Sequence, residues 1–176
     1  MWKEFKPIVL FIAKFFLVYI VLTVIYSWYL QPYLYEQNIT DPITSWMADV
    51  SASLMRAVGF DAYTVQVEGE THKRFFLNGS FASLVNEGCN ALSVVIIFIS
   101  FIVAFSNGIL RTLSYVLGGL VLLLVTNIFR ISLLTYIYRH LPEYSKSAHD
   151  YLFPAIIYGM VVVLWFIWVN KFAFKK

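Results

Sequence analysis

Three residues of the sequence have the side chains that acyl transfer needs, namely Cys89, Arg130 and His149. A thiol attacks a carbonyl as its thiolate, and a neighbouring imidazole or cation favours the thiolate. The imidazole can return the proton to a leaving amine, and a guanidinium can bind a developing oxyanion or a substrate carboxylate or carbonyl. The set is therefore sufficient for proteolysis or transpeptidation through a thioester.

Polar neighbours in the sequence could support this set, and they are Glu87, Asn90, Asn127 and Asp150. Asn127 lies about one helical turn before Arg130, so it either orients the guanidinium or bonds a neighbouring helix. Glu87 is either a site carboxylate or an exposed loop acid. The reactive residues also have simpler interpretations, with Cys89 as a small buried hydrophobe and Arg130 as a charge that snorkels to the membrane interface.

The composition places the chain in a membrane. Hydrophobic residues make up 60% of the chain and charged residues 13%, against roughly 45–50% and roughly 25% in soluble proteins. A domain of this length cannot bury so much apolar surface, so lipid must replace water around it. The single cysteine excludes an intramolecular disulfide, and one Cys with one nearby His does not make a metal site. We expect no cofactor, no metal and no nucleic-acid partner.

Four stretches are apolar and long enough to cross about 30 Å of hydrocarbon, which takes about 20 helical residues. Because backbone groups in lipid must bond internally, each is predicted to be an α-helix. The first is longer than the apolar region of a cleaved signal peptide, so it is predicted to be a retained anchor. Residues 1–176 are therefore expected to form a single all-α integral membrane domain. Its four transmembrane helices are predicted at about 8–29, 89–107, 113–134 and 151–172.

The distribution of Lys and Arg predicts the orientation. With the N-terminus inside, the inner segments hold seven cations and one acid, whereas the outer segments hold five cations diluted among nine acids. The positive-inside rule then favours both termini in the cytoplasm, which an even number of spans allows. The inner cations are Lys3, Lys6, Lys14, Arg111, Lys171, Lys175 and Lys176.

The outer loop of about sixty residues, 30–88, is predicted to form a small extracytoplasmic subdomain. Asp41-Pro42 is typical of a helix start, and Gly59 ends this helix. Its apolar residues recur at helical spacing, so the helix is expected to lie in the outer headgroup plane. Residues 63–67 and 74–77 are predicted to be short strands of a β-hairpin, with Asn78-Gly79 as a turn. The apolar residues of the helix are Ile43, Trp46, Met47, Val50, Leu54 and Val58.

Three segments are predicted to bring the thiol, the guanidinium and the imidazole to one face at a similar depth. Cys89 begins the second span at its outer end, and His149 comes just before the fourth. Arg130 lies 17 residues along the third span, so about 25 Å from the inner surface at 1.5 Å per residue. His72 and His140 also lie in the outer segments and are alternative bases.

The local structure around His149 has two interpretations. Ser147-Ala148-His149-Asp150 matches a capping box, which places His149 in the first turn of a helix. Alternatively, Pro154 is the first helical residue and His149 lies in the preceding loop. In the third span, Gly118-Gly119 is expected to permit close helix packing.

Three of these segments resemble the exosortase/archaeosortase family: Glu87-Gly88-Cys89-Asn90 entering a span, Asn127-Ile128-Phe129-Arg130 within the next, and His149 before another. The resemblance extends from about Asp49 to Trp168, and the compact four-span form most resembles the exosortase F type of the Bacteroidetes group of bacteria. It implies that Cys89 is the nucleophile, His149 the acid/base and Arg130 the oxyanion or substrate binder. Many members have Ser-Gly after the cysteine, where this chain has Asn90-Ala91, which affects the local turn and the substrate motif.

The family is thought to recognise proteins whose C-terminal tail has a short motif, a hydrophobic span and a basic end. It would cleave near the motif and pass the acyl group to an acceptor. The resemblance therefore implies a cysteine protease or transpeptidase of a bacterial inner membrane, with its site facing the periplasm. Its partners would be substrate proteins with a C-terminal sorting signal, the lipid bilayer and an unknown acyl acceptor. The alternative is a non-enzymatic membrane assembly factor or small transporter in which Arg130 is a structural or ligand charge.

Overall fold

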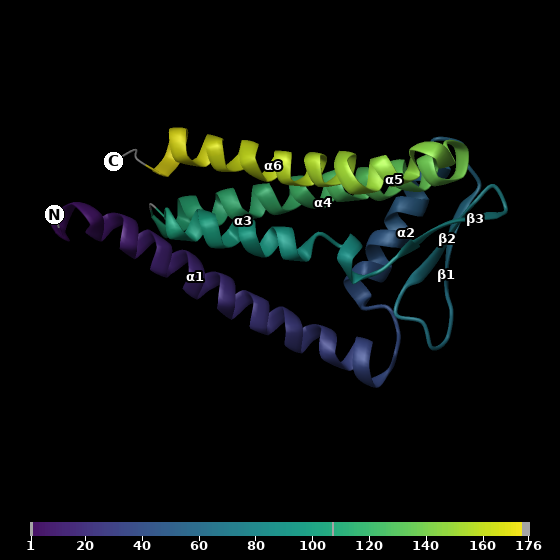
Figure 1. Ribbon diagram of the computed structural model, residues 1–176, viewed down its shortest axis with the longest axis horizontal. Helices are drawn as coiled ribbons and strands as arrows, with labels where there is room; N and C mark the ends of the chain where they lie inside the picture. The colour runs from purple at the N-terminus through teal and green to yellow at the C-terminus, as the bar shows by residue number, and fades with distance from the viewer. Residues whose placement is uncertain (1, 107, 174–176) are drawn as a thin grey trace.

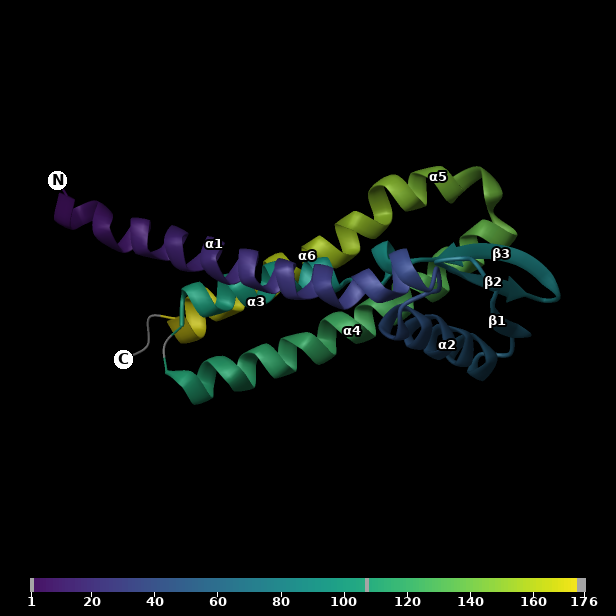
Figure 2. The ribbon, with the colours of Figure 1, turned by 90° about the horizontal axis from the view of Figure 1, so that it is seen from below.

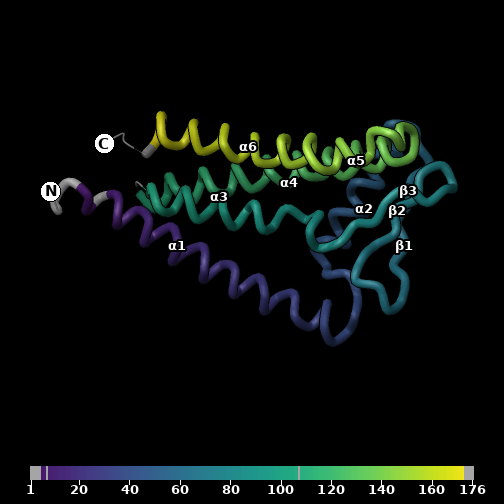
Figure 3. The backbone as a smooth tube through the Cα atoms, viewed as in Figure 1, coloured from purple at the N-terminus to yellow at the C-terminus, as the bar shows by residue number. Residues whose placement is uncertain are grey.

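The computed structural model describes residues 2–106 and 108–173 and shows a helical bundle with a small sheet at one end. The apolar helices α3, α4 and α6 run side by side, α1 crosses them at an angle and diverges toward the sheet end, and α2 packs beside the sheet (Figure 1). α1 begins and α6 ends at the end of the bundle away from the sheet, as the backbone trace also shows (Figure 3). The helices are α1 Trp2–Gln31, α2 Pro42–Ala57, α3 Leu92–Ala104, α4 Ile109–His140, α5 Ser145–Ser147 and α6 Phe153–Trp168.

Short helical turns of other types extend or connect these helices. The π-type turns are η1 Pro32–Glu36, η4 Ala148–Leu152 and η5 Val169–Ala173, and the 3-10 turns are η2 Glu87–Cys89 and η3 Pro142–Tyr144. Within the described residues, three continuous helical segments are long and apolar enough to cross a membrane: Ile8–Glu36, Ile109–His140 and Pro142–Phe172. They confirm the predicted helical membrane protein and three of its four predicted spans.

The predicted second span, about 89–107, is not confirmed as a full span. Helix α3 has 13 residues, about 20 Å at 1.5 Å per residue, which is shorter than the hydrocarbon thickness. The helix starts late because Cys89 ends a 3-10 turn and Ala91 adopts a left-handed backbone conformation. The predicted end of the span, Asn107, lies outside the described residues, as do two predicted inner cations, Lys175 and Lys176.

Three hydrophobic clusters share helix α4. One lies within the bundle, a second lies between α2, the sheet and the second half of α4, and a third joins the end of α4 to the start of α6. α4 contributes Leu123 to the first and Ile131 to the second, so a single rigid helix carries residues from the bundle into the subdomain. The bundle core includes Phe98, Ile102, Val161 and Trp168, and the subdomain core includes Met47, Phe75, Leu77 and Val85.

Close packing of α3 on α4 requires a glycine at position 119. A Cβ built on Gly119 would lie 2.3 Å from Cζ of the fully buried Phe98 ring, whereas one on Gly118 would meet nothing within 4 Å. The predicted close approach is therefore confirmed for Gly119 and wrong for Gly118, which faces away from α3.

We expect Gly119→Ala to destabilise the protein by about 1–3 kcal/mol, because the buried Phe98 ring would have to move. Gly118→Ala is the matched control, and it should raise stability by up to about 1 kcal/mol through helix propensity. Thermal unfolding of both variants in detergent measures the difference. Equal unfolding temperatures would contradict the assigned contact.

The subdomain contains the predicted helix and one more strand than predicted. Asp41 caps α2 by accepting hydrogen bonds from the backbone N–H groups of Ile43 and Thr44, both at 3.1 Å. The sheet has the order β1-β2-β3 and all its neighbours are antiparallel. Asn78 and Gly79 have φ values of 51° and 71° and form the predicted tight turn between β2 and β3. The strands are β1 Ala62–Gln66, β2 Lys73–Leu77 and β3 Ser80–Val85.

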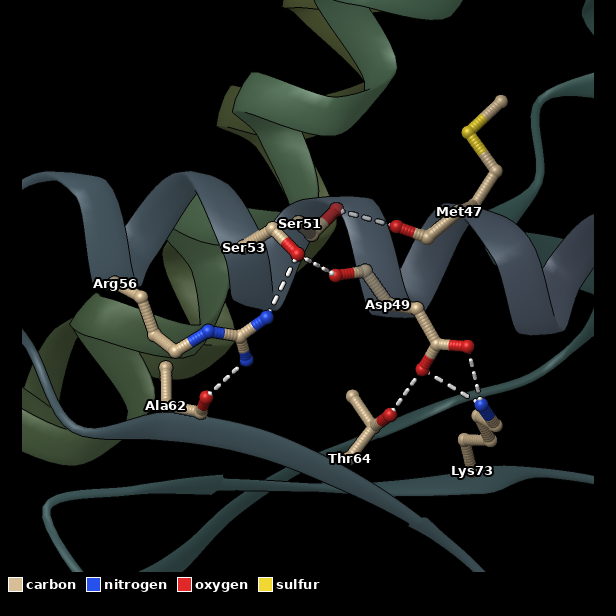
Figure 4. A network of polar contacts seen from close by, with 8 residues as sticks. All are labelled: Met47, Asp49, Ser51, Ser53, Arg56, Ala62, Thr64 and Lys73. Carbon is tan, nitrogen blue, oxygen red and sulfur yellow. Dashed lines mark hydrogen bonds and ion pairs between the residues drawn. The ribbon is translucent and has the colours of Figure 1, made fainter.

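Polar side chains fasten α2 to the sheet. Lys73 donates to both carboxylate oxygens of Asp49, at 2.6 and 2.8 Å, and Thr64 donates to the same carboxylate (Figure 4). About two turns of helix further on, Arg56 donates to the carbonyl oxygen of Ala62 at 2.6 Å. These contacts fix the polar face of α2 against strands β1 and β2.

Candidate active site

Cys89 lies where the subdomain joins the bundle. Strand β3 ends at Val85, the 3-10 turn η2 follows, and α3 begins at Leu92. The backbone N–H of Cys89 donates to the carbonyl oxygen of Asn86 at 2.8 Å, and its thiol donates to the side-chain oxygen of Asn86 at 3.5 Å. The thiol is therefore held by a short turn between two packed elements, and it is partly exposed.

The turn after Cys89 contains an unusual backbone conformation. Ala91 has φ 59° and ψ 10° and is almost completely buried. This left-handed conformation favours glycine, because a Cβ crowds the following carbonyl. The position where many exosortases have glycine is thus occupied by an alanine that adopts the conformation of a glycine.

We expect Ala91→Gly to raise the free energy of unfolding by about 1 kcal/mol, because glycine removes the crowding at positive φ. Ala52→Gly inside helix α2 is the opposite control, and it should lower stability by about 1 kcal/mol or more. Thermal unfolding in detergent reports both changes. A fall in stability for Ala91→Gly would contradict the strain assigned to this turn.

Two buried asparagines hold the chain on either side of the thiol. The Asn90 amide donates to Thr44 Oγ1 of α2 and to the Tyr26 hydroxyl of α1, both at 3.0 Å, and its oxygen accepts from the N–H of Leu92 at 2.8 Å. Asn90 thereby binds the first backbone N–H of α3 and ties the start of this helix to two other helices. Asn127 of α4 donates to the carbonyl oxygen of Cys89 at 2.7 Å.

Arg130 is connected to Cys89 through Asn127. Its Nη1 donates to Asn127 Oδ1 at 3.1 Å, while the Asn127 amide bonds the Cys89 carbonyl. The guanidinium carbon lies 5.9 Å from the centre of the Phe153 ring, which is within range of a cation–π contact. Nε of Arg130 is buried and has no hydrogen-bond partner among the described residues. This N–H is a donor that an added oxygen could satisfy.

Arg130 also lines two adjacent cavities. The smaller, of about 10 Å³, is shared with Cys89 and with residues of β3 and α4, and it is about large enough for one water molecule. The larger, of about 280 Å³, is shared with His149. Arg130 is thus the residue that the cavity beside Cys89 and the cavity beside His149 have in common. The larger cavity is also lined by Glu87, Gly88, Asn90, Ala91, Ser93, Val94, Pro154, Ile157 and Tyr158.

The structure places most of the predicted site residues around one cavity and Cys89 around another. Glu87, Asn90, Arg130 and His149 line the larger cavity, whereas Cys89 lines the smaller cavity, which Arg130 also lines. Among the hydrogen bonds of the described residues, none joins the Cys89 thiol to His149. His149 Nδ1 instead lies 3.1 Å from Asp150 Oδ1, so Asp150 can orient the ring.

Both interpretations of the local structure at His149 are wrong. Ser147 makes no side-chain cap, and its backbone is helical, because the helix has already begun at Ser145 after the 3-10 turn η3. His149 lies inside the π-type turn η4, immediately before α6. A wider turn at this place is compatible with Pro154, whose missing N–H and bulky ring disfavour a regular α-helical turn before it.

The alternative bases lie elsewhere. His72 Nε2 is 3.2 Å from Glu70 Oε2, between β1 and β2, and the His140 ring packs 4.6 Å from the ring of Tyr136. Neither is among the residues that line the two cavities. Glu70 is held mainly by the Arg74 side chain, whose hydrogen bonds lower the pKa of the Glu70 carboxyl.

Sequence reasoning missed the residues that support the site from a distance. Tyr26 and Thr44 hold Asn90 across 64 and 46 positions of the chain. Ser93 and Tyr158 add hydroxyl groups to the wall of the larger cavity. A tyrosine at the end of an apolar helix is also typical of a membrane interface, so no local signal distinguished these residues.

The structure is that of a helical membrane protein in which Cys89 and Arg130 lie where the bundle joins a small subdomain. The family model described as transmembrane exosortase matches residues 7–171, and the chain belongs to this family. Searches of curated proteins and of solved structures found no match. The match extends the resemblance beyond the motifs around Cys89, Arg130 and His149 to nearly the whole chain.

Proposed function

We propose that this exosortase is a cysteine transpeptidase or protease that cleaves C-terminal sorting signals of exported proteins at the periplasmic side of the bacterial inner membrane. The observation that carries the proposal is the chain of contacts Cys89–Asn127–Arg130, together with the buried, unpartnered Nε of Arg130. It provides a nucleophile and a fixed donor for an oxyanion at adjacent positions.

In the proposed reaction, the Cys89 thiol gives its proton to His149, through a water in the cavity. The sulfur then bonds to the scissile carbonyl carbon, and the resulting oxyanion accepts the N–H of Arg130 Nε. The intermediate collapses as the carbon–nitrogen bond breaks, and the imidazolium of His149 protonates the leaving amine. An acceptor nucleophile then gives its proton to His149 as it bonds to the thioester carbon, and the carbon–sulfur bond breaks to release the Cys89 thiolate.

The asparagines prepare this geometry before substrate binds. Asn127 fixes the Cys89 carbonyl and the guanidinium to each other, and Asn90 fixes the start of α3. Both side chains are almost completely buried. Residues whose rotamers are locked by packing and hydrogen bonds hold a site within the narrow tolerance that catalysis needs.

Thiol labelling tests the activation of Cys89. We expect a membrane-impermeant maleimide to label Cys89 at pH 7 from the periplasmic side, and we expect His149→Ala to slow labelling about tenfold, because the thiolate is the form that reacts and the variant removes the base that accepts its proton. Ser53→Cys in a Cys89→Ala background supplies an exposed reference thiol outside the site. An identical labelling rate for Cys89 with and without His149 would overturn the assigned acid/base pair.

A further inference from the structure

Helix α2 has three distinct faces, of which protein covers two and covers the third only in part. Small and flexible residues face α4 and the sheet and are buried: Thr44, Met47, Ala48, Ser51, Ala52 and Met55. The polar face, with Asp49 and Arg56, is bonded to the sheet (Figure 4). The third face carries large apolar residues, and Trp46 on it is 51% exposed. The other large residues of this face are Ile43, Val50 and Leu54, at helical spacing from Trp46.

The level of α2 in the membrane follows from the point at which it crosses helix α4. Phe129 follows Ile109 by 20 residues, so it lies about 30 Å further along the helix, the thickness of the hydrocarbon core. At this level Ser51 Oγ donates to the Ile128 carbonyl at 3.5 Å, and Ser132 Oγ donates to the Ser51 carbonyl at 3.4 Å. The middle of α2 therefore crosses α4 at the boundary of the hydrocarbon core.

Helix α1 independently places α2 at the same level of the membrane. Trp28 follows Ile8 by 20 residues, again about 30 Å along a membrane-spanning helix. The next residue, Tyr29, donates from its hydroxyl to Asp41 Oδ1 at 3.0 Å, and Asp41 is the N-cap of α2. Two spanning helices thus place the first half of α2 at the membrane boundary nearest the site (Figure 2).

We infer that the first half of α2, Pro42–Val50, lies in the headgroup and upper acyl region of the bilayer that the bundle spans. Lipid covers Ile43, Trp46 and Val50, and Trp46 anchors the helix at the interface, where tryptophan is enriched. The apolar face continues onto the lipid-facing side of α4, where Phe129 is exposed next to Ile128. Water is therefore on the sheet side of α2, where Asp49 and Arg56 lie.

The buried side of the first half of α2 contacts the candidate active site. Thr44 accepts a hydrogen bond from Asn90 at 3.0 Å, and the sulfur of Met47 lies 3.9 Å from the Asn127 amide. One side of α2 thus contacts lipid while the other contacts both asparagines beside Cys89. Seating α2 in the membrane fixes the depth of the site at the bilayer surface. The inference rests on the membrane-spanning helices and stands apart from the proposed chemistry.

Depth-dependent fluorescence quenching tests the inference. Trp46→Cys and Ser53→Cys, each in a Cys89→Ala background, are labelled with the environment-sensitive fluorophore NBD and reconstituted in phosphatidylcholine nanodiscs. We expect the label at position 46 to emit at shorter wavelength, and lipids with a nitroxide near the headgroup to quench it about threefold more strongly than the label at position 53. Val50→Cys is a second apolar-face position if loss of Trp46 prevents folding.

Two results would overturn the assignment. In the first, labels at positions 46 and 50 behave like the label at position 53, with water-like emission and quenching by aqueous iodide. In the second, the labels are shielded from both the lipid nitroxide and iodide, which would mean that protein covers this face. Both results would leave the proposed activity of Cys89 unaffected.

Discussion

Cys89→Ala is expected to abolish processing of a reporter that carries a C-terminal sorting signal, with a loss of at least about 10⁴-fold in rate, as for removal of a catalytic nucleophile. The variant loses the only sulfur that could form the thioester, whereas the contacts that hold the turn use the backbone of Cys89. The protein should therefore insert and fold normally. Processing is measured by the mass shift of the reporter in membranes, and the level of the variant by immunoblot.

Cys89→Ser is the companion variant for this prediction. It keeps the size and the hydrogen bonds of the side chain and replaces the thiol by a much weaker nucleophile at neutral pH. We expect it to be as inactive as Cys89→Ala. Wild-type processing by a stably inserted Cys89→Ala protein would exclude the thioester mechanism and favour a non-enzymatic role for the family fold in this chain.

Arg130→Lys is expected to lower kcat by about 10²–10³-fold with little change in KM, as for loss of one oxyanion donor. Arginine can bond Asn127 through Nη1 while its Nε–H remains available for the proposed oxyanion. Lysine keeps the charge, but it has a single ammonium group and cannot make both contacts in this geometry. The stacking of the guanidinium on Phe153 is also lost. A kinetic assay with a purified substrate separates kcat from KM.

Arg139→Lys is the matched control on the same helix. Arg139 is exposed near the end of α4, and its Nη2 lies 3.4 Å from Ser80 Oγ, away from both cavities. We expect its kinetics to be unchanged. Activity of Arg130→Lys within a few-fold of the wild type would contradict the geometric role and leave Arg130 as a structural charge.

The apolar segments were the most predictable part of the fold, because lipid imposes length and composition on a spanning helix. Three of the four segments have the predicted character. The second failed as a full span because composition does not report the backbone at Ala91, whose left-handed conformation delays the start of α3. Such a conformation in an alanine is set by tertiary contacts around it, among them those of Asn90.

The third strand and the faces of α2 were less predictable for a common reason. In β3, Ser83 is buried and bonds Thr135 of α4 at 3.0 Å, while Phe81 and Leu84 are about half exposed, so hydrophobicity does not indicate which side chains of this strand face the interior. In α2, Ala48 and Ala52 face the core and Trp46 does not. At a membrane surface, large apolar residues have a second favourable environment, and hydrophobicity alone no longer indicates the protein interior.

The candidate residues of the site could be selected from the sequence, but their arrangement could not. Polar side chains within a membrane-spanning segment cost free energy, so their presence in the third span drew attention to Arg130 and Asn127. The sequence left open whether Asn127 orients Arg130 or bonds a neighbouring helix. In the structure its oxygen accepts from Arg130 and its amide donates to the Cys89 carbonyl, in the turn before α3. The placement of Cys89 and His149 at different cavities, both lined by Arg130, depends on how α3, α4 and α6 pack.

The most direct test of the central claim is detection of an acyl group on Cys89. Wild-type protein in nanodiscs is mixed with substrate, denatured in acid within the first turnovers, digested and examined by mass spectrometry. We predict that the peptide containing Cys89 carries the N-terminal product of cleavage, and that neutral hydroxylamine removes it, as expected for a thioester. Complete cleavage of the substrate under these conditions, with Cys89 remaining a free thiol at every time point, would contradict the account.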